Sequence, residues 1–248
     1  MAELGQIVLQ QQGCGGPHHR RLLPVPAARH VRLGLVVTVP TLRSLNSAVT
    51  RFWSFAAPVY DAKALQRWVY RPAQDEMVLL LAAHGSRRVA DIACGTGILA
   101  ARIASEVECE AVYGVDFSEG MLAQARGRSA EVQWMSAPAE QLPFGDGSLD
   151  AVVTTSAFHF FNQPAALREF HRVLAPGGLA AVATFTPYQP LPLEWLSASR
   201  FNPAHSPSPA ALRGLFSDAG FRLEDQHRVR RPAWTRFLSD LITVGIKP

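Results

Sequence analysis

The chain has 248 residues, 48% of them hydrophobic and 18% charged, so it can bury the core of one domain of ordinary size and carry additional segments. Its net charge of +4 resides in residues 1–60, which hold six arginines and one acid, whereas residues 61–248 hold 18 basic and 19 acidic residues. This distribution excludes a basic surface that follows a nucleic acid backbone, and no apolar run approaches the roughly 20 residues of a transmembrane helix. We therefore expect a soluble protein with no nucleic acid partner.

Residues 1–48 show no sustained helical or strand period. They combine a glutamine run with clustered glycines and prolines, which is typical of a disordered extension. Their arginine-bearing, acid-poor composition is also that of a mitochondrial targeting segment, so we expect a cytoplasmic protein with a mitochondrial location as the alternative. Cys14, Cys94 and Cys109 lack the spacing of a disulfide framework or a zinc site, and no metal is expected.

Residues 49–248 are predicted to form one domain, which begins with a helical flank or lid over residues 49–85. This flank is rich in aromatic residues, and Pro72 suits the first turn of a helix that ends near His84 and Gly85.

Residues 86–185 alternate between strand and helix patterns. The buried stretch Val89–Gly97 predicts a strand that runs into a glycine turn and then a helix. Further strands are predicted over 109–115, 131–135, 149–154 and 178–185, and further helices over 119–126, capped by Ser118, and 164–174. Strands separated by helices indicate a parallel sheet with right-handed crossovers.

The remaining residues divide into two parts. Six prolines interrupt residues 186–209, and we expect this insertion to lie on the substrate side of the domain. Residues 210–248 predict a helix that ends at Gly220, followed by two terminal strands over 221–230 and 241–247.

The glycine turn is compatible with two classes of ligand. Gly95 and Gly97, with Asp116 about twenty residues later, also fit the fingerprint of an NAD site, where the helix start binds a pyrophosphate. Asp91 separates the two classes, because its carboxylate would repel a pyrophosphate but would attract a ligand with an amine and a sulfonium.

Four ordered segments, Val89–Gly97, Val112–Leu122, Ala139–Asp150 and Arg172–Gly178, resemble the motifs of class I S-adenosylmethionine-dependent methyltransferases. The set is most similar to the branch of ubiquinone and menaquinone biosynthesis methyltransferases. The resemblance implies a Rossmann-like, doubly wound α/β fold with a seven-stranded, mostly parallel sheet whose last strand is antiparallel, preceded by the helical flank.

The resemblance also implies a site for S-adenosylmethionine, made by Asp91, Gly95, Gly97, Asp116, Phe117, Met121, Ala139 and Glu140. Asp116 would accept hydrogen bonds from both ribose hydroxyls. Phe117 and Met121 would flank the adenine, while the glycines and Asp91 would face the methionine portion. Relatives carry an acid where this chain has Pro138, which leaves open how the adenine is recognised; Ser136 is a possible substitute.

His159 follows the fourth predicted strand, at the sheet edge that binds ligands, where a histidine can act as a general base. With Tyr60 and Trp195 it is also a candidate for contact with the substrate. We expect a methyltransferase that acts on an O, C or N atom of a small, apolar or aromatic molecule. An NAD-dependent oxidoreductase and a catalytically silent cofactor-binding protein are the alternatives, and the sequence leaves the oligomeric state open.

Overall fold

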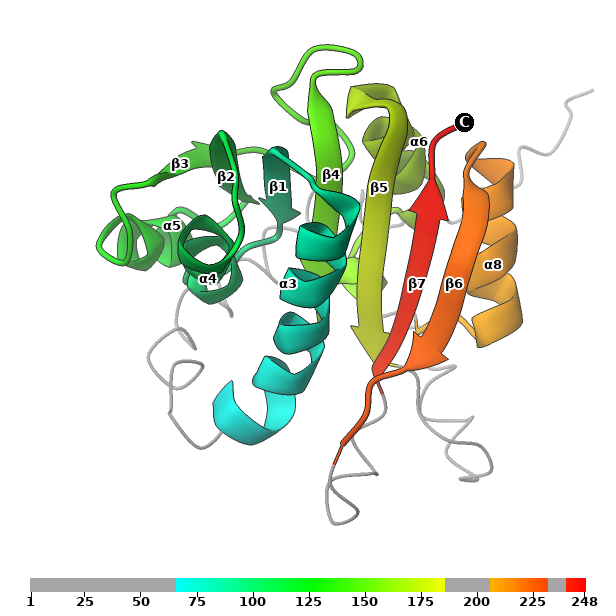
Figure 1. Ribbon diagram of the computed structural model, residues 1–248, viewed down its shortest axis with the longest axis horizontal. Helices are drawn as coiled ribbons and strands as arrows, with labels where there is room; N and C mark the ends of the chain where they lie inside the picture. Colours follow the sequence, from blue (N-terminus) through cyan, green and yellow to red (C-terminus); the bar gives the residue numbers. More distant parts are fainter. Residues whose placement is uncertain (1–65, 186–205, 232–239) are drawn as a thin grey trace, which may run out of the picture. The chain divides into compact units, whose positions relative to one another are not determined.

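The computed structural model describes residues 66–185, 206–231 and 240–248 (Figure 1). The predicted extension over 1–48, residues 49–65 of the helical flank and residues 186–205 of the proline-broken insertion lie outside these residues. Within the described ranges, no helix has the length and apolar character needed to span a membrane.

The described strands form one seven-stranded sheet in the order β3-β2-β1-β4-β5-β7-β6 (Figure 1). Their bounds are β1 Arg88–Ile92, β2 Ala111–Asp116, β3 Val132–Ser136, β4 Leu149–Thr155, β5 Leu174–Phe185, β6 Arg222–Arg228 and β7 Asp240–Ile246. The first five strands pair in parallel, whereas β7 runs antiparallel to both β5 and β6. The sheet predicted from the sequence is therefore confirmed, including its antiparallel last strand.

Helices occupy the predicted places between the strands. Their bounds are α3 Arg71–His84, α4 Ile98–Glu106, α5 Glu119–Arg126, α6 Gln163–Val173 and α8 Pro209–Asp218, with a π-helical turn η1 Gln66–Tyr70 and a 3-10 turn η2 Phe158–Phe160. Local chemistry fixes the ends: the Ser118 hydroxyl accepts from the Met121 N–H at the start of α5, and Gly85 adopts a left-handed conformation at the end of α3.

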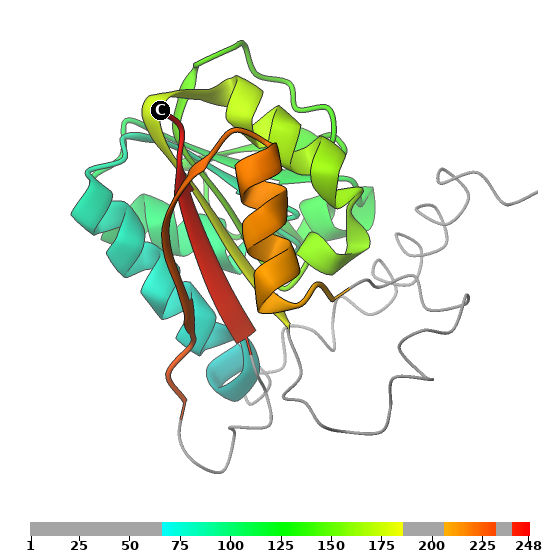
Figure 2. The same ribbon diagram turned by 90° about the vertical axis from the view of Figure 1, so that its right-hand side faces the viewer.

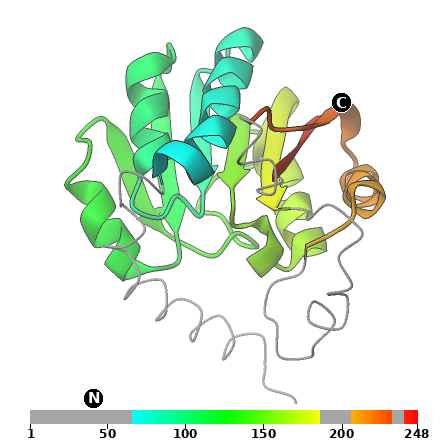
Figure 3. The ribbon, with the colours of Figure 1, turned by 90° about the horizontal axis from the view of Figure 1, so that it is seen from below.

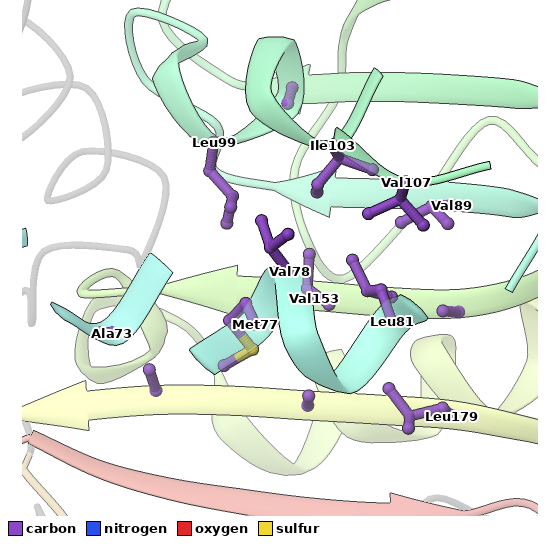
Figure 4. Packing of buried hydrophobic residues seen from close by; sticks show 14 of the residues in the cluster. Ala73, Met77, Val78, Leu81, Val89, Leu99, Ile103, Val107, Val153 and Leu179 are labelled. Atoms are coloured by element: carbon purple, nitrogen blue, oxygen red, sulfur yellow. The ribbon is translucent and has the colours of Figure 1, made fainter. Parts of the chain in front are cut away.

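Two hydrophobic cores cover the two faces of the sheet, because successive strand residues point to opposite sides. Val89 belongs to the core under α3 and α4, whereas its neighbour Ala90 belongs to the core under α6 and α8. Met77 and Leu81 of α3 are fully buried against the first face (Figure 4), and each contributes about 1.5–3 kcal/mol by leaving water. In Figures 2 and 3 helices lie on both faces of the sheet, so its strand ends are the edges left for a site.

One strand begins four residues earlier than expected, while the bounds of the others, such as β2 and β6, differ by at most two residues. β5 begins at Leu174 rather than at Gly178, because Leu174 already pairs with Leu149 of β4. The register then shifts, so that the next pair is Ala151 with Leu179. The residues between Leu174 and Leu179, which include Pro176, Gly177 and Gly178, form a bulge within the strand.

Candidate functional site

A pocket opens at the carboxyl ends of β1, β2 and β4, where a parallel sheet of this type binds ligands. Its empty volume is about 950 Å³, including the open mouth. The lining residues are Tyr70, Ala93, Gly95, Asp116, Phe117, Ser118, Met121, Ala137, Pro138, Ala139, Glu140, Thr155, Ser156, Ala157, Phe160 and Phe161. Most of this surface is apolar, and the described part of the lining contains two carboxylates but no lysine or arginine.

Strained backbone follows two of the strands at the pocket. Ala93, directly after β1, has a φ of 56°, and Ser156, directly after β4, has a φ of 57°. Residues with a β-carbon rarely adopt such angles, and where they do the surrounding structure must enforce the conformation. Both residues line the pocket, so the strain is located at the ligand edge.

The two predicted glycines have different surroundings. Gly95 lines the pocket with a φ of 57°, in agreement with a loop that lies against a ligand. Gly97 has a φ of 80° and is buried, and a β-carbon there would lie 2.4 Å from Cη2 of Trp134. Gly97 is therefore required by a turn and by close packing on Trp134, whereas its predicted contact with the cofactor stays a prediction.

Asp116 ends β2 at the floor of the pocket. Its Oδ2 accepts from the Gly95 N–H at 2.8 Å, and its Oδ1 accepts from the Ser118 N–H at 2.7 Å. Burial raises the pKa of Asp116, and these backbone hydrogen bonds oppose the rise. A carboxylate offers about four lone-pair positions, so this geometry leaves capacity on both oxygens for hydroxyl donors in the pocket.

Asp91 lies behind the glycine loop and is 2% exposed, outside the pocket lining. Its carboxylate accepts a hydrogen bond from the Ala100 N–H, in the first turn of α4, whose N-cap residue Gly97 supplies no side-chain cap. Burial, with the charge of Asp116 as the second cause, raises the pKa of Asp91 well above its usual range. Two acids thus share one poorly solvated region, where a positively charged ligand would relieve their repulsion.

The residues predicted for the adenine side form one wall of the pocket. Phe117 is 50% exposed there, an unusual position for a large apolar ring, while Met121 and Ala139 are buried beside it. Glu140 also lines the pocket, but its Oε1 accepts from the Asn162 N–H at 2.7 Å and so holds the start of α6. Ser136 is exposed and is not part of the lining, which removes the support for it as the adenine acceptor.

His159 does not line the pocket, although its neighbours Phe160 and Phe161 do. Burial lowers the pKa of His159 to about 4, and its buried Nδ1 has no hydrogen-bond partner among the described residues. The expectation of a general base relied on a pKa near 6.5. An imidazole with this lowered pKa is a weak base. The catalytic role of His159 therefore stays a prediction, and the geometry of the site does not support it.

Tyr70, Phe160 and Phe161 line the pocket but were not among the predicted site residues. Phe160 and Phe161 stand next to His159, so the position of that residue after β4 was the available signal. Tyr70 lies in η1, and nothing in the sequence except the aromatic content of the flank indicated that it would line the pocket. The predicted substrate residues Tyr60 and Trp195 lie outside the described residues.

Comparison with known proteins finds similarity in the part of the chain that contains β1 to the start of β5. Residues 89–178 match the family described as "Methyltransferase domain". A 2-phytyl-1,4-naphtoquinone methyltransferase of Nostoc punctiforme is 34% identical over 153 residues, which cover 57% of this chain and 66% of that protein. A malonyl-[acyl-carrier protein] O-methyltransferase of Geobacter sulfurreducens is 40% identical over 132 residues, or 51% of this chain and 48% of that protein. The chain thus spans between about half and two thirds of these relatives.

A solved structure agrees in fold. Magnesium protoporphyrin IX methyltransferase from Synechocystis, with bound S-adenosylhomocysteine, superimposes with a TM-score of 0.64 over 82% of this chain and 100% of that chain. The sequence identity is 19%, so this similarity shows the arrangement of helices and strands alone.

Proposed function

Residues 89–178 of this chain form a methyltransferase domain of the class I, S-adenosylmethionine-dependent family, and from this premise we propose that the protein transfers a methyl group from S-adenosylmethionine to a small, uncharged aromatic molecule. The sulfonium of this cofactor supplies an electrophilic methyl group. The protein aligns a nucleophilic O, C or N atom behind it and excludes water. When bound, the cofactor would give up this methyl group and leave as S-adenosylhomocysteine, and the acceptor atom would release its proton to solvent.

The residues at the start of α4 favour one class of cofactor over the other. In an NAD site the N–H groups at this helix start bind the pyrophosphate. Here the buried carboxyl group of Asp91 already accepts from the Ala100 N–H, so an anion would find this donor occupied and would meet a negative charge whenever the acid is ionised. A ligand with an ammonium and a sulfonium group fits this environment. We therefore favour S-adenosylmethionine over NAD.

Asp116 and Phe117 support the same cofactor. The unused lone pairs of Asp116 suit the two ribose hydroxyls, and the exposed ring of Phe117 suits a stacked base. We assign Met121 and Ala139 to the same side of the adenine. Asp91 acts in this proposal through its charge and through the helix start.

The acceptor is proposed from the character of the pocket. Phe160 and Phe161 present aromatic surface, and no cationic residue stands in the described part of the lining to bind an anionic group. Of the two relatives, the naphtoquinone methyltransferase has the acceptor that fits such a lining, whereas a malonyl group carries a carboxylate. A reduced naphthoquinone is accordingly the model acceptor.

The test uses the full chain with S-adenosylmethionine that carries an isotopic label in its methyl group. We expect label in a reduced naphthoquinone and none in a malonyl thioester, and the Asp116→Ala variant should transfer none. Label in the malonyl thioester alone would contradict the proposed acceptor class. A chain that binds the cofactor but transfers the label to no component of a cell extract would be the catalytically silent alternative.

A further inference from the structure

Among the described residues, Tyr70 is the one pocket residue that precedes β1 in the sequence. A buried arginine binds the backbone directly before it. Tyr70 is the last residue of η1, and it lines the pocket opposite the strand ends. The turn runs directly into α3, and a contact from outside this helix binds two of its carbonyls. Arg231, far along the sequence, supplies that contact.

The Arg231 guanidinium joins three segments. Its Nη1 donates to the Trp68 carbonyl at 2.8 Å, and its Nη2 donates to the Val69 carbonyl at 2.6 Å. The same Nη2 pairs with Oδ2 of Asp240, the first residue of β7. The Arg231 side chain is 2% exposed and that of Asp240 is 9% exposed, so the contact is almost fully removed from water.

The sequence of η1 and α3 explains why the Trp68 carbonyl needs a donor. In an α-helix the Trp68 carbonyl would accept from the N–H of residue 72, but Pro72 has none. The helix is widened to a π-helical turn before this proline, and Arg231 donates to the carbonyl. A planar guanidinium presents its donors in a rigid fork that matches two neighbouring carbonyls and a carboxylate, whereas the donors of an ammonium radiate from one atom on a flexible chain.

Asp240 connects this contact to the ligand edge of the sheet. It pairs with Phe185 at the carboxyl end of β5, and burial followed by its charge raises the pKa of Tyr70, a sign that the two side chains are close. Tyr70 therefore stays protonated and can donate a hydrogen bond at neutral pH.

We propose that Arg231 is a positioning residue that fixes Tyr70 in the cofactor pocket through the carbonyls of Trp68 and Val69. This inference rests on the proposed function, because S-adenosylhomocysteine is the ligand used to test it. It assigns a role in binding to the segment that follows β6, which contributes no described residue to the pocket lining.

The test is a double-mutant cycle with Tyr70→Ala and Arg231→Lys, read by calorimetric titration with S-adenosylhomocysteine. Lysine keeps a positive charge beside Asp240, so the carboxylate is not left unpaired, but it loses the fork that binds both carbonyls. Each single variant should weaken binding about tenfold, the effect of one hydrogen bond, and the double variant should be no weaker than Tyr70→Ala.

A matched control separates positioning from loss of stability. Arg88 also pairs with an aspartate, Asp150, but at the opposite edge of the sheet. Arg88→Lys should leave the affinity unchanged. Hydrogen exchange should accelerate in residues 66–70 of Arg231→Lys and not across the sheet. The inference fails if Arg231→Lys binds S-adenosylhomocysteine as well as wild type does, or if the losses of affinity in the two single variants add fully in the double variant. If wild type does not bind S-adenosylhomocysteine, the proposed function fails.

Discussion

Replacing Asp116 by alanine separates ligand binding from stability. The carboxylate holds the loop through Gly95 and Ser118, and in the proposed complex it also accepts two ribose hydroxyls. Each hydrogen bond to a charged group is worth about 1.5–3 kcal/mol, so losing two costs at least about 3 kcal/mol of binding free energy. That corresponds to a roughly 150-fold weaker affinity for S-adenosylhomocysteine.

The effect of Asp116→Ala on folding should be smaller. Two backbone N–H groups lose their charged acceptor, at about 1.5–3 kcal/mol each. Part of this loss is offset, because burial disfavours the charged form of Asp116, as its raised pKa shows. We expect the thermal transition to fall by a few degrees, at roughly 2–4 °C per kcal/mol for a domain of this size.

Asp150→Ala is the matched control. Asp150 also accepts from two backbone N–H groups, those of Arg87 and Arg88, at the opposite edge of the sheet. Calorimetric titration and thermal unfolding of both variants give the comparison. Both should lose stability, and Asp116→Ala alone should lose affinity. Wild-type affinity in Asp116→Ala, or an equal loss in both variants, would refute the assignment of Asp116 to the ribose.

Three further predictions concern other parts of the fold. Burial lowers the pKa of His227, but its hydrogen bonds, of which that to Glu76 is the largest, outweigh burial and raise the pKa. The protonated histidine therefore stabilises the folded state, and the free energy of unfolding should fall as pH rises from about 6.5 through the folded-state pKa. Denaturant titrations across this range check it, and an unchanged slope in Glu76→Gln would count against the contact. A β-carbon at Gly114 would lie 2.3 Å from Cζ3 of Trp134, so Gly114→Ala should cost about 1–3 kcal/mol, measured by urea unfolding; an unshifted midpoint would show that the ring adjusts freely. The ring of His159 should titrate near pH 4 by NMR, and a midpoint near its ordinary value would restore it as a candidate base.

Local sequence signals were sufficient to predict most of the fold. The strands alternate between two cores, so their hydrophobic pattern is strong, and caps such as Ser118 and Gly85 end or begin helices by local chemistry. Asp116 was assigned to the cofactor by its spacing from the glycine turn and by the resemblance to class I methyltransferases, and its position directly after a predicted strand agrees with that assignment.

Long-range contacts explain what the sequence did not predict. Tyr70 reaches the pocket through a contact with Arg231, a residue more than 160 positions away, and no local pattern encodes such a pair. The left-handed conformations of Ala93 and Ser156 have no sequence marker, since glycine is the residue that normally indicates them. The lowered pKa of His159 depends on burial, which a strand-end position does not reveal.

The most direct measurement is calorimetric titration of the full chain with S-adenosylhomocysteine and, separately, with NADH. The carboxylate of Asp91 at the start of α4 and the free lone pairs of Asp116 predict saturable binding of S-adenosylhomocysteine and none of NADH. Binding of NADH without S-adenosylhomocysteine would contradict the account.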